Sequence, residues 1–518
     1  MAAIASAFLC AVCCSCIKNN IPYPRIQVNF TRFVVEGQTR AASIDSANRI
    51  LTAYLGETAD PYAVRVTDYA ITAGGEILDN PFTAPTVDLA GGLTLTLRLY
   101  QDYTWVVRAV QDIERYFTVD GQIGSSVIDP VGRRIIVQMP MSADISRLHV
   151  VAAKLGVTGS VMDPDVAGSV IDASAPFEIM VSAFGREERW TLYVEKTDAN
   201  VTTVRADGWT RVAWVYGQAQ ANADFGVEYR MKGDSQWTRC PDGWLNVAGG
   251  DFTARITGLL PLTTYEARAF SDGEYGATLE FTTGQDVQVP NSTFDDWWKD
   301  NKVWCPWPEG GQQVWDTGNK GATTLGESNS IPSDDTSTGS GQAACLETRF
   351  VGIGPLGKLA AGNIFVGRYV RTDGTNGVLS LGHAFNERPT KLTGYFKYKS
   401  APISSTTEGF TDMAGKPDTC TVWIALIDAA QPFEIRTNPK NRQLFDPAAP
   451  DVVAYGAMQT SQSTDSYARF EIDLDYRATD RVPSYILITA SASKYGDYFT
   501  GGNGAVLYID DLQLLYDY

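Results

Sequence analysis

The chain has 518 residues, enough for three or four domains of ordinary size. Its residues are 44% hydrophobic and 20% charged, so it is expected to fold as a globular protein. The formal net charge is −18 and no Lys/Arg cluster is present, which argues against nucleic acid as a partner and against charge-driven docking on anionic lipid. Two histidines in the whole chain do not favour a His-rich metal site or a His-based triad.

The first 16 residues, MAAIASAFLCAVCCSC, are small, apolar and uncharged. This run is too short to cross a bilayer, and it predicts a signal segment. Its end, a small residue before Cys16, resembles the lipobox of bacterial lipoproteins, with Cys16 as the lipidated residue. We therefore expect an outer-membrane protein held at the cell surface by its lipid alone. An ordinary cleaved signal with incidental cysteines is the alternative.

Four later cysteines, Cys240, Cys305, Cys345 and Cys420, are far apart and form no CxxC pair, so a zinc site is not expected. Buried free thiols are favoured over a disulfide in the last domain.

An internal repeat organises the first part of the chain. A shift of 84 residues places Phe33 on Phe117 and Val66 on Val150, with 10 identities in 34 positions. Alternating β-branched runs separated by Gly, Pro and Asp predict two β-sandwiches, at 22–114 and 115–198. They resemble the Ig-like repeats found near the anchors of gut-bacterial surface lipoproteins.

Residues 199–286 resemble a fibronectin type III domain. The run Ile256-Thr-Gly-Leu-Leu-Pro-Leu-Thr-Thr-Tyr matches the corner of that fold, where Tyr265 would hydrogen-bond to backbone. The resemblance makes Trp214 the core tryptophan. The alternative, that Trp214 and Trp237 bind a ligand, is less favoured because aromatic residues in a sandwich normally pack. We expect all three modules to act as spacers.

Residues 287–518 show many strand patterns and no long helical one, which predicts a jelly roll. Several segments in one order are similar to the putative carbohydrate metabolism domain family: Trp315-Asp-Thr-Gly-Asn, Ala361-Gly-Asn-Ile-Phe-Val-Gly, Phe385-Asn-Glu-Arg-Pro-Thr-Lys-Leu-Thr-Gly-Tyr-Phe-Lys-Tyr, Ser493-Lys-Tyr-Gly-Asp-Tyr-Phe-Thr-Gly-Gly and Tyr508-Ile-Asp-Asp-Leu-Gln-Leu. The resemblance implies a jelly roll on surface lipoproteins linked to polysaccharide use, without a defined reaction.

Sugars offer apolar faces to aromatic rings and hydroxyls to polar groups, so the candidate glycan site combines both kinds of side chain. The stacking candidates are Trp304, Trp307 and Trp315, and the hydroxyl-binding candidates are Asp316, Asn319, Tyr495 and Asp497. Core packing is the alternative for tryptophans in this cluster, strongest for Trp297. The alternative for Asp497 is to cap the glycine-rich turn.

Other polar residues suggest further chemistry. His383 is a possible base, but a solvated loop histidine is favoured. The pairs Asp295-Asp296 and Asp510-Asp511 would attract a structural Ca²⁺ if first and last strands are neighbours, the alternative being solvated acids. No other cofactor is expected.

Three functions compete for the last domain. The first is capture of a glycan or polysaccharide, with outer-membrane uptake proteins as further partners. The second is glycoside hydrolysis, which needs two carboxylates about 5–10 Å apart; the candidates are Glu347, Glu387, Asp428 and Asp497. The third is an adhesin that binds a partner protein. An aromatic cleft would favour glycan, and a flat apolar patch would favour protein.

Overall fold

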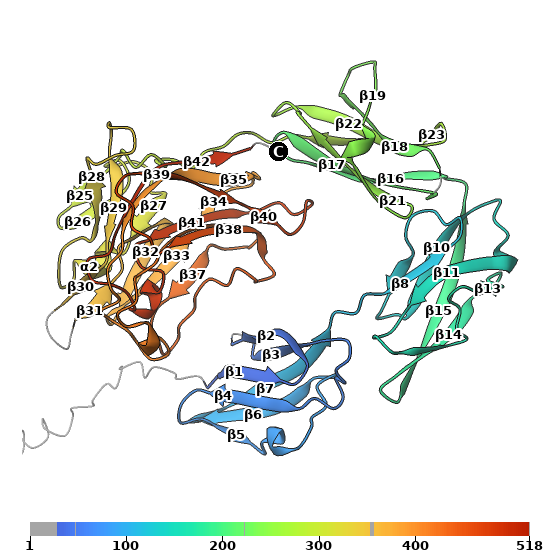
Figure 1. Ribbon diagram of the computed structural model, residues 1–518, viewed down its shortest axis with the longest axis horizontal. Coiled ribbons are helices and arrows are strands. Elements are labelled where there is room, and N and C mark those ends of the chain that lie inside the picture. Colours follow the sequence, from blue (N-terminus) through green and yellow to red (C-terminus); the bar gives the residue numbers. More distant parts are fainter. Residues whose placement is uncertain (1–27, 47, 222, 353–356, 517–518) are drawn as a thin grey trace, which may run out of the picture.

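The computed structural model describes residues 28–46, 48–221, 223–352 and 357–516. The signal segment at 1–16 and the lipidation site Cys16 lie outside the described residues. Within the described part, the chain is almost entirely β and forms successive β-sandwiches, so the predicted fold class is confirmed (Figure 1). No described helix has the length and apolar character needed to span a membrane.

The first two units have equivalent topologies, which agrees with the sequence repeat. Each has a five-stranded sheet with one parallel pair, β3 with β7 in the first unit and β10 with β15 in the second. A smaller sheet closes each core around a fully buried tryptophan, Trp105 or Trp190. The strands of the first unit are β1 (Phe30–Val35), β2 (Gln38–Asp45), β3 (Ile50–Leu55), β4 (Val66–Ile71), β5 (Glu76–Leu78), β6 (Leu93–Leu99) and β7 (Gln101–Gln111). Those of the second are β8 (Tyr116–Val119), β9 (Val127–Asp129), β10 (Arg134–Pro140), β11 (Leu148–Lys154), β12 (Val161–Asp163), β13 (Val170–Ile171), β14 (Phe177–Ala183) and β15 (Arg186–Thr197).

The third unit packs the sheet β16-β17-β21-β20 against a sheet built on β18 and β22. Its strands are β16 (Val201–Gly208), β17 (Val212–Ala219), β18 (Phe225–Met231), β19 (Thr238–Arg239), β20 (Leu245–Ala248), β21 (Asp251–Thr257), β22 (Thr264–Ser271), β23 (Glu274–Tyr275) and β24 (Leu279–Thr282). The tyrosine corner is present, since the Tyr265 hydroxyl accepts a hydrogen bond from the Leu260 N–H at 3.0 Å.

The expectation that Trp214 is the core tryptophan is wrong. Successive side chains of a strand point to opposite faces. In β17 the residues on either side, Ala213 and Val215, are buried in the core, so Trp214 points outward and is half-buried. It packs instead against Trp209, with ring centroids 4.4 Å apart.

The last unit is a larger sandwich with the predicted jelly-roll layers. A nine-stranded sheet, ordered β37-β33-β32-β41-β36-β38-β40 with β27 and β34 attached, faces the sheet β28-β29-β42-β35-β39. The strands are β25 (Trp298–Asp300), β26 (Val303–Cys305), β27 (Trp315–Thr317), β28 (Ser330–Ser333), β29 (Ala343–Glu347), β30 (Arg349–Val351), β31 (Lys358–Ala360), β32 (Asn363–Asp373), β33 (Asn376–Leu381), β34 (His383–Ala384), β35 (Lys391–Lys399), β36 (Cys420–Ile427), β37 (Phe433–Arg436), β38 (Val452–Thr460), β39 (Ala468–Asp473), β40 (Asp475–Tyr476), β41 (Tyr485–Ser491) and β42 (Val506–Leu515), with one short helix, α2 (Asn319–Ala322). The 3₁₀ turns of the chain are η1 (Pro81–Thr83), η2 (Ile145–Arg147), η3 (Asp242–Trp244), η5 (Thr411–Met413) and η6 (Gly496–Tyr498).

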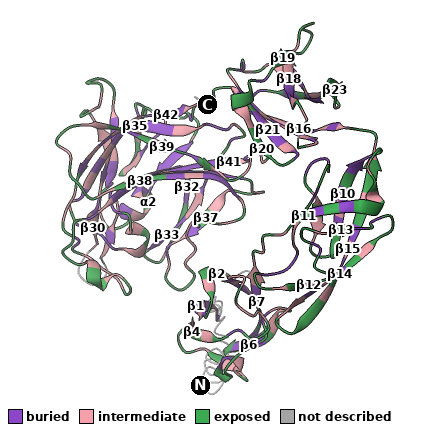
Figure 2. Cartoon of the chain, turned by 45° about the vertical axis from the view of Figure 1, so that its right-hand side comes forward, coloured by how far each residue is buried: buried purple, intermediate pink, exposed green. Residues whose placement is uncertain are grey.

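The nine-stranded sheet is apolar on both faces. Val422, Ile424 and Leu426 of β36 point into the sandwich core, while Ala425 and Ile427 join a second apolar cluster on the opposite face. Figure 2 shows the resulting buried residues along β32 and β41. Several residues of this second cluster, Phe365 and Ile435 among them, line a pocket on the outer face of the sheet.

Contacts between units fix the last sandwich to the third. The Trp209 indole N–H donates to the Thr479 carbonyl at 2.9 Å, and its ring lies 4.3 Å from that of Tyr476. Arg205 pairs with Asp480 at 3.2 Å. The first and second units meet at Glu57, which lies 2.8 Å from the Lys154 ammonium.

The four later cysteines in the described residues are free thiols, as favoured from the sequence.

Candidate functional site

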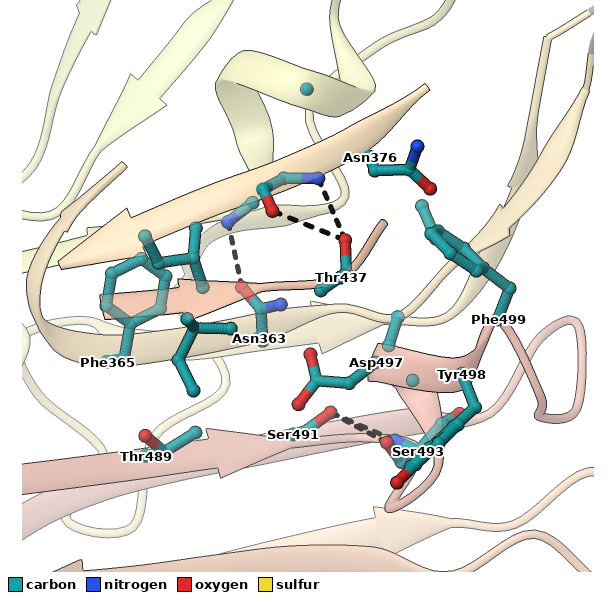
Figure 3. A pocket seen from close by; sticks show the side chains of 18 of the residues that line it. Asn363, Phe365, Asn376, Thr437, Thr489, Ser491, Ser493, Asp497, Tyr498 and Phe499 are labelled. Carbon is teal, nitrogen blue, oxygen red and sulfur yellow. Dashed lines mark hydrogen bonds between the residues drawn. The ribbon is translucent and has the colours of Figure 1, made fainter. Parts of the chain in front are cut away.

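A pocket of about 460 Å³ opens on the outer face of the nine-stranded sheet. Its floor comes from the consecutive strands β32 and β33 and from β41 and β36, which lie beside them in the sheet in the order β33-β32-β41-β36. The segments 437–447 and 493–499 and helix α2 contribute its walls. Figure 3 shows labelled side chains of β32, β33 and β41, with Thr437 and residues of the segment 493–499, around the same space.

One wall of the pocket is aromatic. Trp423 of β36 stacks on Phe445, with ring centroids 5.0 Å apart and planes only 6° from parallel. Tyr455 of β38 lies 6.4 Å from both rings, and Phe365 of β32 adds a buried ring to the floor. All four rings line the pocket. They offer the flat apolar surface on which a sugar ring can stack.

Polar residues lie among and beside these rings, and protein contacts leave several of their groups unsatisfied; Thr489, for example, is the cross-strand neighbour of both Trp423 and Phe365. The Asn363 side-chain oxygen accepts the Gly318 N–H at 2.8 Å, while no described residue accepts from its amide nitrogen. Within the described residues, the buried Thr489 hydroxyl and the buried Asn329 side-chain oxygen have no hydrogen-bond partner. Unsatisfied buried polar atoms are energetically unfavourable. Asn363 is half-buried, so its amide nitrogen is the group among them that can donate to a polar ligand in the pocket.

Asp497 supplies the carboxylate of the pocket and is the only Asp or Glu in its described lining. The carboxylate points across the pocket toward Asn363 and Ser491 (Figure 3). It accepts no hydrogen bond from the described residues and does not cap the turn η6. Water reaches it through the opening, yet protein surrounds it, and this desolvation raises the pKa of Asp497 while Arg442 opposes the shift.

A buried network holds the segment that carries Asp497. The Asp418 carboxylate accepts from the Gly502 N–H at 2.6 Å and from the Ser493 hydroxyl, which also contacts the Thr348 hydroxyl at 2.6 Å. Burial raises the pKa of Asp418. Gly496 packs so closely on Ala361 that an added Cβ would lie 2.5 Å from the alanine Cβ. The segment is therefore fixed at both ends of η6.

Two cations lie beside aromatic rings of the same segment. The Lys358 ammonium lies 4.2 Å from the Phe499 ring centroid and donates to the Asn376 side-chain oxygen at 3.1 Å. The Arg442 guanidinium lies 4.5 Å from the Tyr498 ring centroid. Lys358 lines the pocket, as do both of these rings.

The structure separates the sequence-predicted site residues. Tyr495 and Asp497 line the main pocket, whereas Trp304, Trp307, Trp315, Asp316 and Asn319 do not. Trp307 and Trp315 border a smaller cavity of about 140 Å³, and Trp304 is half-buried beneath Lys299. The single predicted cleft is thus not formed.

Three of the predicted residues are buried, and this corrects the expectation that they contact a ligand. Trp315 is 1% exposed and donates its indole N–H to the Pro290 carbonyl. Asn319 is fully buried and binds backbone groups of Trp304, Asn329 and Ser330. Asp316 accepts from the Tyr369 N–H at 2.8 Å, and burial raises its pKa. Asp316 therefore supports the pocket residue Tyr369 from beneath.

The hydrolase candidates are also dispersed. Glu347 pairs with Arg349, Asp428 lies 3.7 Å from Arg481, and Glu387 accepts from the Gln285 N–H at the contact with the third unit. None of these three lines the pocket. His383 is half-buried in β34, where desolvation lowers its pKa.

The acidic pairs proposed for Ca²⁺ bind backbone and hydroxyl groups. Asp510 accepts from the Ser337 N–H at 2.6 Å, Asp511 from the Ser337 hydroxyl at 3.0 Å, and Asp295 from the Gln342 N–H at 2.9 Å. Across the described residues, no group of three or more His, Cys, Asp or Glu side chains is arranged to hold a metal ion.

Sequence reasoning missed Trp423, Asn363, Thr489 and Lys358. Trp423 and Thr489 lie in runs whose composition predicts strands, and Asn363 lies in a segment that carries the family resemblance, but alternation within one strand does not show which of its faces lines a pocket. The available signal was in β36: a strand in which Thr421 is the one polar residue predicts burial on both faces, and hence an outer face that is partly covered.

Comparison with known families supports the sequence resemblance. Residues 293–515 match the family model described as the putative carbohydrate metabolism domain, so this part of the chain is similar to a carbohydrate-related family. No curated protein matches the chain.

Several solved structures are distantly similar to this chain. A putative glycoside hydrolase from Bacteroides thetaiotaomicron is 17% identical, with 78% of this chain and 96% of that chain covered and a TM-score of 0.32. A putative glycoside hydrolase from Bacteroides vulgatus is 24% identical, with 42% and 94% covered and a TM-score of 0.33. The surface glycan-binding protein PbSGBP-B from Prevotella bryantii is 9% identical, with 79% and 100% covered and a TM-score of 0.16. Likeness at this level says nothing about activity or ligand.

Proposed function

We propose that the chain binds glycan in the pocket of its last domain. The observation that carries this proposal is that one pocket combines an aromatic wall, Trp423 with Phe445, and two polar groups with free hydrogen-bonding capacity among the described residues, the Asn363 amide nitrogen and the Asp497 carboxylate, in a segment that matches a carbohydrate-related family model. A ligand for such a pocket has an apolar face and several hydroxyls, which is the chemistry of a sugar ring. A volume of about 460 Å³ suits a ligand of small-molecule size.

Binding of glycan fragments to the full chain tests the proposal directly. A glycan array identifies ligands, and calorimetric titration then compares wild type with Trp423→Ala. Loss of the stacking ring is expected to weaken binding by roughly 1–3 kcal/mol, or about 5- to 150-fold in Kd.

Trp304→Ala is the matched control, since Trp304 is half-buried and outside the pocket. It should leave Kd unchanged. Thermal melts of both variants separate lost contact from lost folding. Equal weakening by both variants, or none by Trp423→Ala, would contradict the assignment of the pocket.

Hydrolysis of a glycoside is the second candidate, because the raised pKa of Asp497 suits a general acid. The usual mechanism needs a second carboxylate, and the described lining offers only Asp497. Binding is therefore favoured. Turnover of a glycan ligand by wild type, lost in Asp497→Asn with binding retained, would reverse this preference.

We further propose that the protein is a cell-surface lipoprotein, lipidated at Cys16 and working with outer-membrane glycan uptake proteins. The support is the lipobox-like sequence and three sandwiches suited to act as spacers between an anchor and the glycan domain. Cys16→Ala should move the protein from the membrane fraction to the soluble fraction. Retention of the variant in the membrane fraction would refute lipid anchoring at this residue.

A further inference from the structure

The charge of the pocket differs from that of the protein. The chain has a formal net charge of −18, yet the charged side chains in the described pocket lining are Lys358, Lys494 and the single carboxylate Asp497. Arg442 stands just behind the lining, against the Tyr498 ring. Two lysines and one carboxylate therefore line this pocket in an otherwise acidic protein, and the resulting local electrostatic potential favours an anion.

Lys358 has no counter-ion among the described residues. No carboxylate lies within 4.0 Å of its ammonium, whose contacts are the neutral Asn376 side chain and the Phe499 ring. Lys358 is half-buried, and desolvation, followed by the nearby Arg442, lowers its pKa. A partly desolvated cation without a partner is unfavourable, and an anionic group on a ligand would relieve that cost.

Asp497 leaves room for such an anion because it faces another part of the pocket. Its carboxylate points toward Asn363 and Ser491, while Asn376 and Phe499, the two neighbours of Lys358, lie on the other side (Figure 3). The pocket thus has a cationic end at Lys358 and a hydroxyl-binding end at Asp497 and Asn363. The aromatic wall of Trp423 and Phe445 belongs to the same cavity.

We infer that the pocket selects acidic sugars, with the carboxylate or sulfate of the ligand bound by Lys358 and its ring hydroxyls by Asn363 and Asp497. This inference rests on the proposed glycan-binding function and names its ligand class. Carboxylate and sulfate share the chemistry that Lys358 recognises, namely a negatively charged oxygen that accepts a charge-assisted hydrogen bond.

The test compares matched acidic and neutral ligands on the full chain by titration calorimetry. Oligogalacturonides and their carboxyl-reduced products form one arm, and sulfated carrageenan oligosaccharides and their neutral desulfated products form the other. At least one acidic ligand should bind roughly tenfold or more tightly than its neutral counterpart, and its affinity should fall as salt rises. The arm that shows this preference identifies carboxylate or sulfate.

Variants assign the preference to Lys358. Lys358→Gln should remove the acidic preference, and Lys358→Arg should retain most of it. Lys440→Gln is the control, because it removes an equal charge from an exposed residue outside the pocket lining. Thermal melts verify that each variant folds.

The failures are distinguishable. Neutral ligands that bind as tightly as acidic ones, with Lys358→Gln without effect, would overturn the acidic specificity and leave glycan binding intact. An acidic preference that Lys358→Gln and Lys440→Gln reduce equally would overturn the role of Lys358. Absence of binding to any glycan by the folded wild type would overturn both this inference and the proposed function.

Discussion

Trp209 couples the third unit to the last sandwich, and its removal should uncouple them. Its side chain is 3% exposed between Trp214 and Tyr476, and its indole N–H donates to the Thr479 carbonyl at 2.9 Å. A buried tryptophan removes roughly 150–250 Å² from water, and truncation of such a residue typically costs about 3–5 kcal/mol. Trp209→Ala should lose about this amount, mostly from the contact between the units, because Tyr476 and Thr479 belong to the last sandwich.

Differential scanning calorimetry of the full chain measures this loss. The transition that includes the last sandwich should fall by several degrees, at about 2–4 °C per kcal/mol for a unit of this size. Trp237→Ala is the matched control: it lies in the same unit, away from the contact, with Arg230 4.3 Å from its ring. Its loss should be about 0.5–1 kcal/mol. An unchanged transition in Trp209→Ala, or an equal shift in Trp237→Ala, would refute the coupling.

Three further predictions concern single side chains. The pKa of Asp497 in the folded protein is raised above its ordinary value of 3.8, so the charged carboxylate destabilises the fold as pH rises. Asp497→Asn should therefore raise the melting temperature at pH 7. In a series of melts at different pH, this gain should disappear below about pH 3.8. The hydrogen bond with Lys154 is the main cause that lowers the pKa of Glu57 to about 2. The charged Glu57 therefore stabilises the fold above its ordinary pKa of 4.5, and this effect is lost as pH falls toward 2. Glu57→Gln should lower the free energy of unfolding at pH 7 and match wild type at pH 2. Tyr265→Phe removes the hydrogen bond to the Leu260 N–H and should cost about 1 kcal/mol in chemical denaturation, whereas no loss would show that the corner is held by packing alone.

The fold follows from the sequence because its local signals agree. Period-two alternation predicts strands, and the repeat predicts two units of one topology, which the parallel pairs β3–β7 and β10–β15 bear out. The tyrosine corner needs only a short local segment, so Tyr265 was identified with its role. Each of these features depends on residues close in sequence or on a recurring pattern.

The sequence predicted residues of the candidate site only where they lie within one short segment of the chain. The segment that carries Tyr495 and Asp497 is dense in polar and aromatic residues beside a glycine-rich turn, and both residues line the pocket. Trp315, Asp316 and Asn319 share that composition, but they are buried. Composition shows that a residue can bind a sugar; burial decides whether a ligand can reach it.

The sequence by itself determined the all-β class, the repeat and the resemblance of the last domain to a carbohydrate-related family. Only the tertiary structure decided the pocket, because sheet order brings together Asn363, Trp423 and Thr489 from β32, β36 and β41. It also decided which face of β36 remains open to a ligand: both faces are apolar, so alternation separates Val422 from Trp423 without showing which points into the sandwich. Packing of the second sheet against one face leaves the other for the pocket.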